Sequence, residues 1–210
     1  LLPVLGKIDL AMVGEPTGME MAVAEKGLIV LRCRAKGRSG HAARDNGENA
    51  ISNAMQDIQW LHSYQFPNVS EMLGQVKMTV TMISAGTQHN VIPDHCEYTI
   101  DIRTTDTANN ALVLKTIQAH IAAEITGPNL NLNASTIAPD HPLVLKAKSL
   151  GIPCFGSPTL SDQSLLDAPS VKMGPGRSER SHTANEYVHI SEIRQGIEGY
   201  IDLLEQFLKI

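Results

Sequence analysis

Two segments far apart in the chain each set a metal-binding residue type beside turn-forming residues. An apolar run ends at Gly14-Glu15-Pro16, and His182 follows the turn Gly174-Pro175-Gly176. A divalent ion such as zinc accepts imidazole nitrogen and carboxylate oxygen together, and open α/β sheets place sites at the carboxyl ends of strands. Glu15 and His182 are therefore candidate metal ligands, although Glu15 alone fits a surface turn carboxylate equally well.

Three further polar residues could bind a substrate. His41 lies in a glycine-rich loop, residues 37–43, where an ordinary solvated histidine is the alternative. Asn90, in the polar loop 88–93, could donate a hydrogen bond to an oxyanion. Arg103 ends an alternating segment and could hold a carboxylate through two parallel hydrogen bonds, whereas most arginines at strand ends are only solvated.

Other catalytic classes lack their motifs. Ser161-Asp162 and Ser39-Gly40-His41 contain nucleophile and base types, but no GxSxG elbow, Walker loop or GxGxxG occurs. The cysteines are odd in number and without CxxC spacing, which favours free thiols in a reducing cytoplasm; they are Cys33, Cys96 and Cys154.

Composition narrows the class of partner. The chain has 210 residues, 42% of them hydrophobic and 19% charged, with a net charge of -5 and one Trp. These values suit a globular protein and argue against nucleic acid as a partner. No apolar stretch reaches the ~18 residues of a membrane span. The chain begins at Leu1 with a buried strand expected over residues 7–13 and no partner strand before it, so we expect the C-terminal part of a longer polypeptide.

The middle of the chain, residues 26–133, predicts a βαββαβ arrangement of the ferredoxin-like kind. The expected strands are 27–35, 76–83, 96–103 and 129–133, and the expected helices are 49–61 and 111–125. Such a sheet leaves one face and one edge strand uncovered, which a partner subunit could supply. The inward helical positions expected are Ile51, Ala54, Met55, Ile58 and Leu61 in the first helix, and Leu112, Ile117, His120, Ile121 and Ile125 in the second.

The flanking blocks, residues 1–25 and 134–210, predict α/β structure. Extended segments are expected at 7–13, 20–24 and 170–173, with helices at 141–150 and 191–208. Ser191 is the expected N-cap of the last helix. Its expected inward positions are Ile193, Ile197, Ile201, Leu204 and Leu208.

Taken together, these segments resemble the acetylornithine deacetylase and succinyl-diaminopimelate desuccinylase family of zinc-dependent amidohydrolases, which also includes carboxypeptidases and dipeptidases. No single motif carries the likeness, but their order and rough spacing do. The matching segments are 12–17, 26–27, 37–43, 47–51, 86–93, 101–103, 174–176 and 181–188.

The resemblance implies an α/β zinc-peptidase-like catalytic domain, residues 1–25 and 134–210, with an inserted dimerisation or lid domain, residues 26–133. It implies two zinc ions in the intact enzyme, with cobalt as a substitute, bound in part by Glu15 and His182. It also implies a homodimer in which His41 stabilises the oxyanion in the partner's active site. The substrate-binding positions that it implies are Asn90, Arg103, Gly174 and Gly176.

The implied reaction is hydrolysis of the amide bond of an N-acyl amino acid similar to N-acetyl- or N-succinyl-ornithine, in arginine biosynthesis. Leu160 departs from the family's Gly-rich pattern in the segment 155–163 and could alter the pocket wall. The family's general base and several ligands precede the matched region, so we expect this chain alone to be inactive and to bind zinc weakly. A carboxypeptidase or dipeptidase of the same family and a stand-alone dimerisation or binding module are the alternatives.

Overall fold

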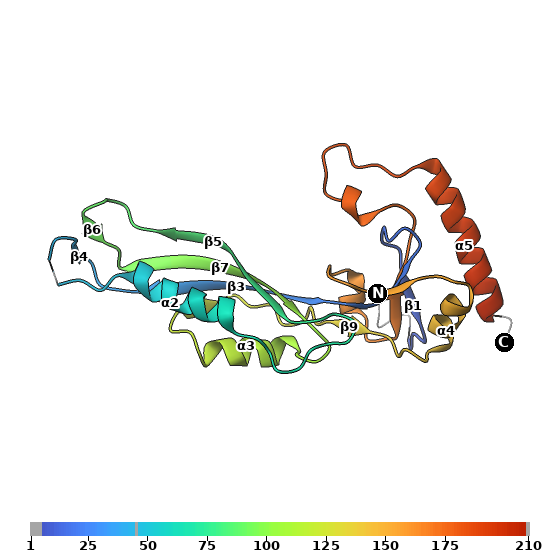
Figure 1. The fold of residues 1–210 in the computed structure, drawn as a ribbon, viewed down its shortest axis with the longest axis horizontal. Coiled ribbons are helices and arrows are strands. Elements are labelled where there is room, and N and C mark those ends of the chain that lie inside the picture. The colour runs from blue at the N-terminus through green and yellow to red at the C-terminus, as the bar shows by residue number, and fades with distance from the viewer. Residues whose placement is uncertain (1–5, 45, 209–210) are drawn as a thin grey trace. The chain divides into compact units, whose positions relative to one another are not determined.

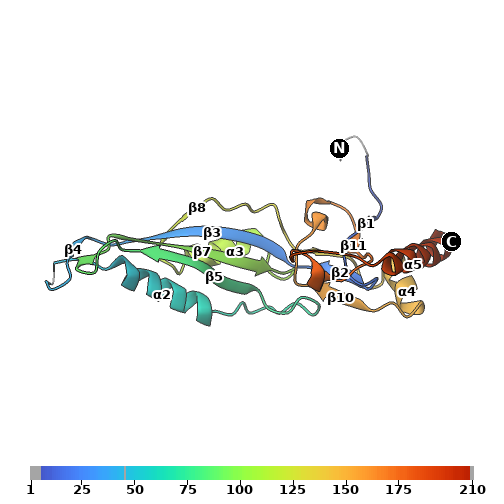
Figure 2. The same ribbon diagram turned by 90° about the horizontal axis from the view of Figure 1, so that it is seen from above.

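The computed structural model describes residues 6–44 and 46–208, shown as ribbons in Figures 1 and 2. The chain divides into two compact units. The first consists of Leu1–Lys26 and Ala134–Ile210, and the second of Gly27–Asn133.

The second unit is a four-stranded antiparallel sheet in the order β5-β7-β3-β8. In chain order it has the βαββαβ sequence, so the expected mixed α/β class with a ferredoxin-like block is confirmed. A short ribbon of β4 and β6 is added at one end. The elements are β3 (Gly27–Lys36), β4 (Gly40–His41), α2 (Ala50–Ser63), β5 (Lys77–Ala85), β6 (Val91–Ile92), β7 (His95–Thr104), α3 (Asn110–Gln118) and β8 (Glu124–Thr126).

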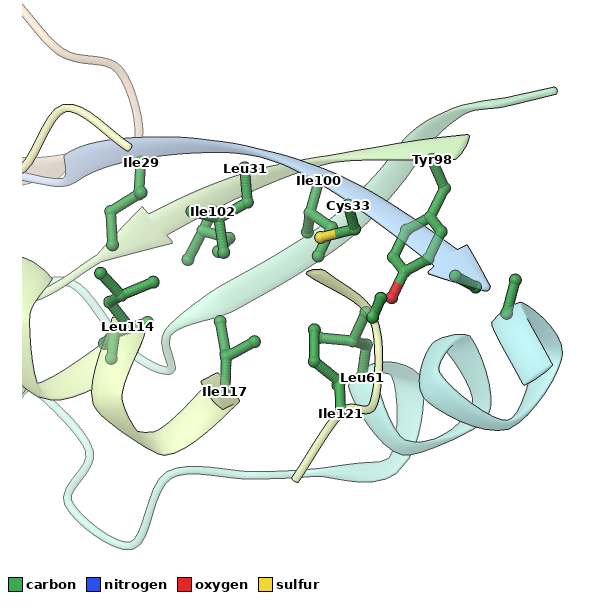
Figure 3. Packing of buried hydrophobic residues seen from close by; sticks show 14 of the residues in the cluster. Ile29, Leu31, Cys33, Leu61, Tyr98, Ile100, Ile102, Leu114, Ile117 and Ile121 are labelled. Atoms are coloured by element: carbon green, nitrogen blue, oxygen red, sulfur yellow. The ribbon is translucent and has the colours of Figure 1, made fainter. Parts of the chain in front are cut away.

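One face of this sheet is buried beneath the two helices. Every second residue of β3 is buried, as the period of two requires of a half-covered strand. In Figure 3 these side chains and those of β7 point toward α3 and the end of α2. The buried contacts include Ile29, Leu31, Cys33, Ile100, Ile102, Leu114, Ile117 and Leu61.

A buried carboxylate organises the helix ends of the second unit. Asp57 of α2 accepts hydrogen bonds from the Tyr98 hydroxyl at 2.9 Å and from the backbone N–H groups of Ala122 at 2.9 Å and Ala123 at 3.1 Å. Asp57 thus satisfies donors that would otherwise lack partners in the interior of the unit.

The neighbouring Cys33 thiol is also buried. Burial raises the pKa of this thiol to about 11, so it stays neutral at ordinary pH.

Several expectations for the second unit are wrong. Met55 is 62% exposed, because α2 turns Ala50, Ala54, Asp57 and Leu61 inward instead. The helix expected over 111–125 ends at Gln118, because Asp57 binds the N–H groups of residues 122 and 123. Two of its expected inward positions are exposed: Leu112, because α3 buries Val113, Leu114 and Ile117 instead, and His120, which lies beyond the helix end.

The closing strand is β8 rather than residues 129–133. In that segment the carbonyls of Leu130 and Leu132 accept hydrogen bonds from the Asn110 side chain, at 3.3 and 2.9 Å. The Leu132 carbonyl also accepts from the N–H of Leu28 at 2.9 Å. These partners replace a strand ladder.

The edge strand β5 presents apolar side chains to its surroundings. A register shift between Val80 and Met82 leaves Met82 67% exposed and Ile83 56% exposed. The uncovered edge and face expected from the sequence are therefore present in this unit.

The first unit contains a five-stranded sheet in the order β1-β11-β2-β10, with β9 also paired to β2. Two helices, α4 and α5, pack with this sheet around a core that includes Met21, Leu143 and Leu203. The elements are β1 (Ala11–Val13), β2 (Met21–Glu25), β9 (Ser135–Thr136), α4 (Pro142–Ser149), β10 (Cys154–Ser157), the 3₁₀ helix η1 (Asp162–Leu165), β11 (Ser170–Lys172), the 3₁₀ helix η2 (Ser178–Arg180) and α5 (Ile190–Leu208).

The first strand is shorter and less buried than expected. Only Ala11–Val13 pair, because the parallel partner β11 is itself three residues long. Lys7 is exposed, and all three residues of β1 are half-buried.

The expected inward face of the last helix is also wrong. Ile193, Ile197 and Ile201 are all at least 40% exposed, and α5 packs instead through Gly196 and Leu203. Leu204 is half-buried, and the side chain of Leu208 lies outside the described residues.

Ser191 is not the cap of that helix. The helix begins at Ile190, and the Glu192 side chain accepts a hydrogen bond from the His189 N–H at 2.9 Å. This is the side-chain-to-backbone half of a capping box, in which the carboxylate satisfies a free N–H at the helix start. Among the described residues no helix is long and apolar enough to cross a membrane.

Candidate metal and substrate site

The site begins where two parallel strands end together. Val13 of β1 pairs in register with Lys172 of β11, and the Met173 N–H donates to the Val13 carbonyl at 3.0 Å. The chain therefore leaves both strands at the same edge of the sheet, where Glu15 follows β1 and Gly174 follows β11. This is the edge at which open α/β sheets bind ligands.

The two turns beyond these strands are bonded to each other. The carbonyl of Gly174 accepts from the N–H groups of Thr17 at 3.1 Å and Met19 at 3.0 Å. In return the Gly174 N–H donates to the Thr17 hydroxyl at 3.1 Å. A Cβ on Gly174 would lie 2.6 Å from the Glu15 carbonyl oxygen, so only glycine allows this approach.

A third segment brings the histidine to the same region. His182 has a φ of 59°, in the left-handed region that few non-glycine residues adopt. Its N–H donates to a Glu186 carboxylate oxygen at 3.1 Å. Backbone strain of this kind is often held at ligand-binding positions, where surrounding contacts maintain it.

Glu192 holds both ends of the loop that carries His182. One carboxylate oxygen accepts from the Arg180 guanidinium at 2.7 Å and from the His189 N–H at 2.9 Å. The Arg180 hydrogen bond is the main reason that the pKa of Glu192 lies below its usual range. Arg180 also lies over the Tyr187 ring, 4.8 Å from its centroid.

Glu15 and His182 line one cleft of about 650 Å³. The structure thus brings the two candidate ligands to one place within the first unit. Gly174 and Gly176 shape the turns behind it, and both are buried. The remaining lining residues are Pro16, Thr17, Gly18, Glu20, Phe155, Ser157, Pro158, Thr159, Leu160, Lys172, Arg177, Ser178, Glu179 and Ser181.

The donors of this cleft fit part of a zinc site. One imidazole and one carboxylate match the ligand types of catalytic zinc, which uses three protein ligands and leaves one position open. Within residues 6–44 and 46–208, however, no three His, Cys, Asp or Glu side chains converge on one point. Glu15 and His182 therefore suit a metal centre whose other ligands this part of the chain does not supply.

His41 and Asn90 are neighbours in the second unit. Strands β4 and β6 pair His41 with Val91, and the N–H of Ala42 donates to the Asn90 carbonyl at 3.0 Å. Both side chains are exposed. A hollow of about 480 Å³ lies against the same ribbon and is lined in part by Ala42 and His89.

Arg103 lies at the opposite end of that sheet. It pairs with Leu28 near the start of β3, whereas the ribbon follows Lys36 at the other end. The intervening eight strand positions span roughly 26 Å at about 3.3 Å per residue. Its guanidinium makes two hydrogen bonds to Asp101, at 2.7 and 3.0 Å, so one edge of the planar fork is occupied.

Lys172, which lines the cleft, belongs to a charged pair that the sequence did not predict. Lys172 and Glu25, both buried, form an ion pair at 3.3 Å. The available signal was one charge at the end of each of two apolar strands. Sequence alone does not show that the strands are neighbours.

Comparison with known proteins identifies one domain of the chain and several relatives. The peptidase dimerisation domain of the M20 family matches residues 23–126. Acetylornithine deacetylase of Myxococcus xanthus is 26% identical over 90% of this chain and 55% of that protein. A probable carboxypeptidase of Aspergillus flavus is 24% identical over 91% of this chain and 50% of that protein.

A similar solved structure is a tripeptidase of Staphylococcus aureus, with a TM-score of 0.77 and 18% identity. The superposition covers 100% of this chain and 60% of the tripeptidase chain. The chain thus spans little more than half of the proteins that it matches. Fold and cleft together define a peptidase-like α/β protein with an inserted dimerisation domain. Residues 23–126 carry the peptidase dimerisation domain of the M20 family, and the chain as a whole is similar to acetylornithine deacetylases and carboxypeptidases, which confirms the resemblance found in its motifs.

Gly174→Ala is expected to disrupt the site by forcing the Glu15 turn away from β11. Overpacking of this kind costs about 2 kcal/mol. Gly14→Ala is the matched control, because a Cβ there meets no atom within 4 Å. Urea denaturation of both variants measures the difference. Equal stability of the two variants would contradict the close approach.

Glu192→Ala is expected to loosen the loop that carries His182, because Arg180 and the His189 N–H lose their common acceptor. Amide hydrogen exchange across residues 180–189 should become faster, whereas Glu198→Ala, an exposed change on the same helix, should leave it unaltered. Since the pKa of Glu192 is lowered, the Arg180 pair is complete above the ordinary pKa of about 4.3. It is lost only as pH falls through the lowered value. Unchanged exchange in Glu192→Ala would contradict this account.

Proposed function

We propose that the natural full-length protein hydrolyses the amide bond of an N-acyl amino acid, with Glu15 and His182 as two ligands of a dinuclear zinc centre. The observation that carries this proposal is that both side chains line one cleft at the ends of two paired parallel strands. Cobalt is the expected substitute metal.

In this mechanism the residues of the chain bind the metal and orient the substrate beside it. A bound metal would supply Lewis-acid polarisation of the carbonyl and an activated water. Glu15 is held by the turn contacts of Gly174, and His182 by the loop that Glu192 clamps. Rigid placement of both donors keeps the reorganisation needed during the reaction small.

Substrate recognition is assigned to the second unit. Arg103 binds the α-carboxylate of the substrate through the edge of its guanidinium that Asp101 leaves unused. Asn90 and His41 donate hydrogen bonds to the substrate carbonyl as it becomes an oxyanion. In the first unit, Gly174 and Gly176 serve substrate binding by shaping the turns behind the cleft, since the Gly174 N–H and carbonyl are already bonded to Thr17 and Met19.

The distance between Arg103 and the His41–Asn90 ribbon favours two active sites in a homodimer. Arg103 and the His41–Asn90 ribbon are roughly 26 Å apart along the sheet at about 3.3 Å per residue. An N-acyl amino acid is far shorter than that distance. If all three residues contact substrate, Arg103 serves one site and the ribbon serves another, which supports a role for His41 in trans.

An acylornithine is the favoured substrate, in arginine biosynthesis in the cytoplasm. The acetylornithine deacetylase of Myxococcus xanthus supports the substrate class. The free cysteines Cys33, Cys96 and Cys154 suit a reducing compartment.

A peptidase is the second candidate, favoured by the likeness to the Aspergillus flavus carboxypeptidase and the Staphylococcus aureus tripeptidase. A stand-alone dimerisation module remains the alternative from another class. Glu15 and His182 in one cleft argue against it, because a module of that kind needs no metal ligands.

The proposed activity is tested directly by comparing N-acylornithines with dipeptides and tripeptides as substrates. Zinc-loaded full-length protein is expected to release acetate or succinate from N-acylornithine faster than it cleaves dipeptides or tripeptides. Glu15→Gln and His182→Ala should each lose bound zinc and activity, whereas Glu20→Gln, a change of another cleft carboxylate, should keep both. Metal analysis and acyl-release assays measure these outcomes. Faster peptide cleavage would select the peptidase, and no hydrolysis at all would remove both.

The trans role of His41 is tested by mixing two inactive variants. His41→Ala should lower kcat on the order of 10²–10³ while metal content stays intact, because only an oxyanion contact is lost. Mixed with Glu15→Ala, it should regain part of the activity, since a heterodimer can combine an intact metal site with an intact His41. His89→Ala is the control. Verified heterodimers that remain inactive would exclude action in trans.

A further inference from the structure

We propose that Lys172, together with Glu25, is a positioning residue that fixes the wall of the substrate cleft formed by residues 157–161. The inference rests on the proposed function in taking that cleft as the place where substrate binds. No motif in the sequence pointed to either residue.

Lys172 directs its ammonium group at one end of this wall. The side chain is 4% exposed, and Nζ donates to the Ser157 hydroxyl at 2.8 Å. It also lies 3.2 Å from both the carbonyl oxygen and the hydroxyl of Thr159. An ammonium has three protons, and the Ser157 and Thr159 oxygens, with Glu25, surround it.

Glu25 holds the other end of the wall. Its carboxylate is fully buried and accepts the Ser161 hydroxyl at 2.7 Å and the Ser161 N–H at 3.2 Å. The same carboxylate pairs with Lys172 at 3.3 Å. The ion pair therefore grips the wall at both ends, and four of its five residues, Ser157–Leu160, line the cleft with Glu15 and His182.

The position of Lys172 in the chain connects the wall to the metal-ligand turn. Lys172 ends β11, two residues before Gly174, whose backbone fits against Glu15. The strand that sets the Glu15 turn therefore also carries the group that sets the wall. A displacement of the wall should change how substrate binds and leave Glu15 in place.

A buried ion pair is a poor means of stabilisation, which favours a positioning role. Desolvation of two charges offsets most of their attraction, and apolar replacements of similar volume are often as stable. Removing one partner alone leaves an unpaired buried charge and destabilises the protein strongly. Fold stability and wall position can thus be separated by comparing single and double variants.

The experiment uses zinc-loaded full-length protein with Lys172→Met, Glu25→Leu and the double variant. Lys148→Met, an exposed change on α4, is the matched control. Both single variants should have a lowered Tm, and the double variant should recover most of the loss. All three should show about tenfold faster amide exchange at Thr159 and Ser161, because the wall has lost its anchors. In the double variant KM should remain raised about tenfold with kcat and zinc content nearly unchanged.

Two results would overturn the positioning role of Lys172 and Glu25. If KM returns to the unmodified value as Tm recovers, the pair is only structural and the proposal fails. Unchanged exchange at Thr159 and Ser161 in the double variant overturns it as well. The exchange and Tm measurements need no substrate, so failure to hydrolyse any N-acylornithine, dipeptide or tripeptide removes the proposed function while the positioning role is still decided.

Discussion

The close approach between the Glu15 turn and Gly174 is the constraint on which the site depends. Parallel pairing of β1 with β11 brings the two chain segments to the same sheet edge, but pairing alone does not fix the loops beyond it. The missing side chain of Gly174 does, because it lets the N–H and the carbonyl of that residue make three hydrogen bonds with Thr17 and Met19. The position of the carboxylate is thus set by backbone packing and not by contacts of the carboxylate itself.

The two units bury acidic groups in different ways, and the difference follows from what surrounds each one. Asp57 is satisfied by neutral donors, a tyrosine hydroxyl and two backbone N–H groups, so it can sit in an apolar helix-sheet interface. Glu25 is fully buried and is paired with the cation of Lys172, which lines the cleft. Neutral donors suffice where only a fold must be held, whereas a full opposite charge also binds the adjoining loop strongly.

Periodicity predicted the long strands β3, β5 and β7 well, but it misplaced the closing strand and predicted the helix faces poorly. The alternation in β3 and β7 is visible in sequence because a half-covered sheet must bury every second residue. In α2 the apolar Met55 suggested an inward position, but the buried position belongs to Asp57, whose partners come from residues 98, 122 and 123. No periodicity reveals such distant partners.

The candidate site was predictable to the same limited degree. Residue type and turn context singled out Glu15 and His182 as candidate ligands, since each lies beside turn-forming residues that are visible in the sequence. The Lys172–Glu25 pair has no such sequence context, because it exists only through the sheet order that makes β11 and β10 neighbours of β2. Likewise the spacing of Ile193, Ile197 and Ile201 in α5 predicted a core face, but all three are exposed. The helix is closely packed at Gly196 and Gly199 instead, where an added Cβ would approach Met19.

The polar residues of the second unit differ in how far they lie from the two points where the chain enters and leaves the unit, at Gly27 and Asn133. Asn110 is buried and bonds to the carbonyls of Leu28, Leu130 and Leu132, which ties the incoming and outgoing segments together at one end of the sheet. Arg103 pairs with Leu28 at that end, so covalent connection and Asn110 both restrict where it lies. The ribbon that carries His41 is at the far end, where the two-residue pairing of β4 with β6 and a few backbone hydrogen bonds, such as that of Ala42 with Asn90, support it. A catalytic role there requires contacts from outside the unit to hold the ribbon, and a symmetric partner would supply them to both copies at once.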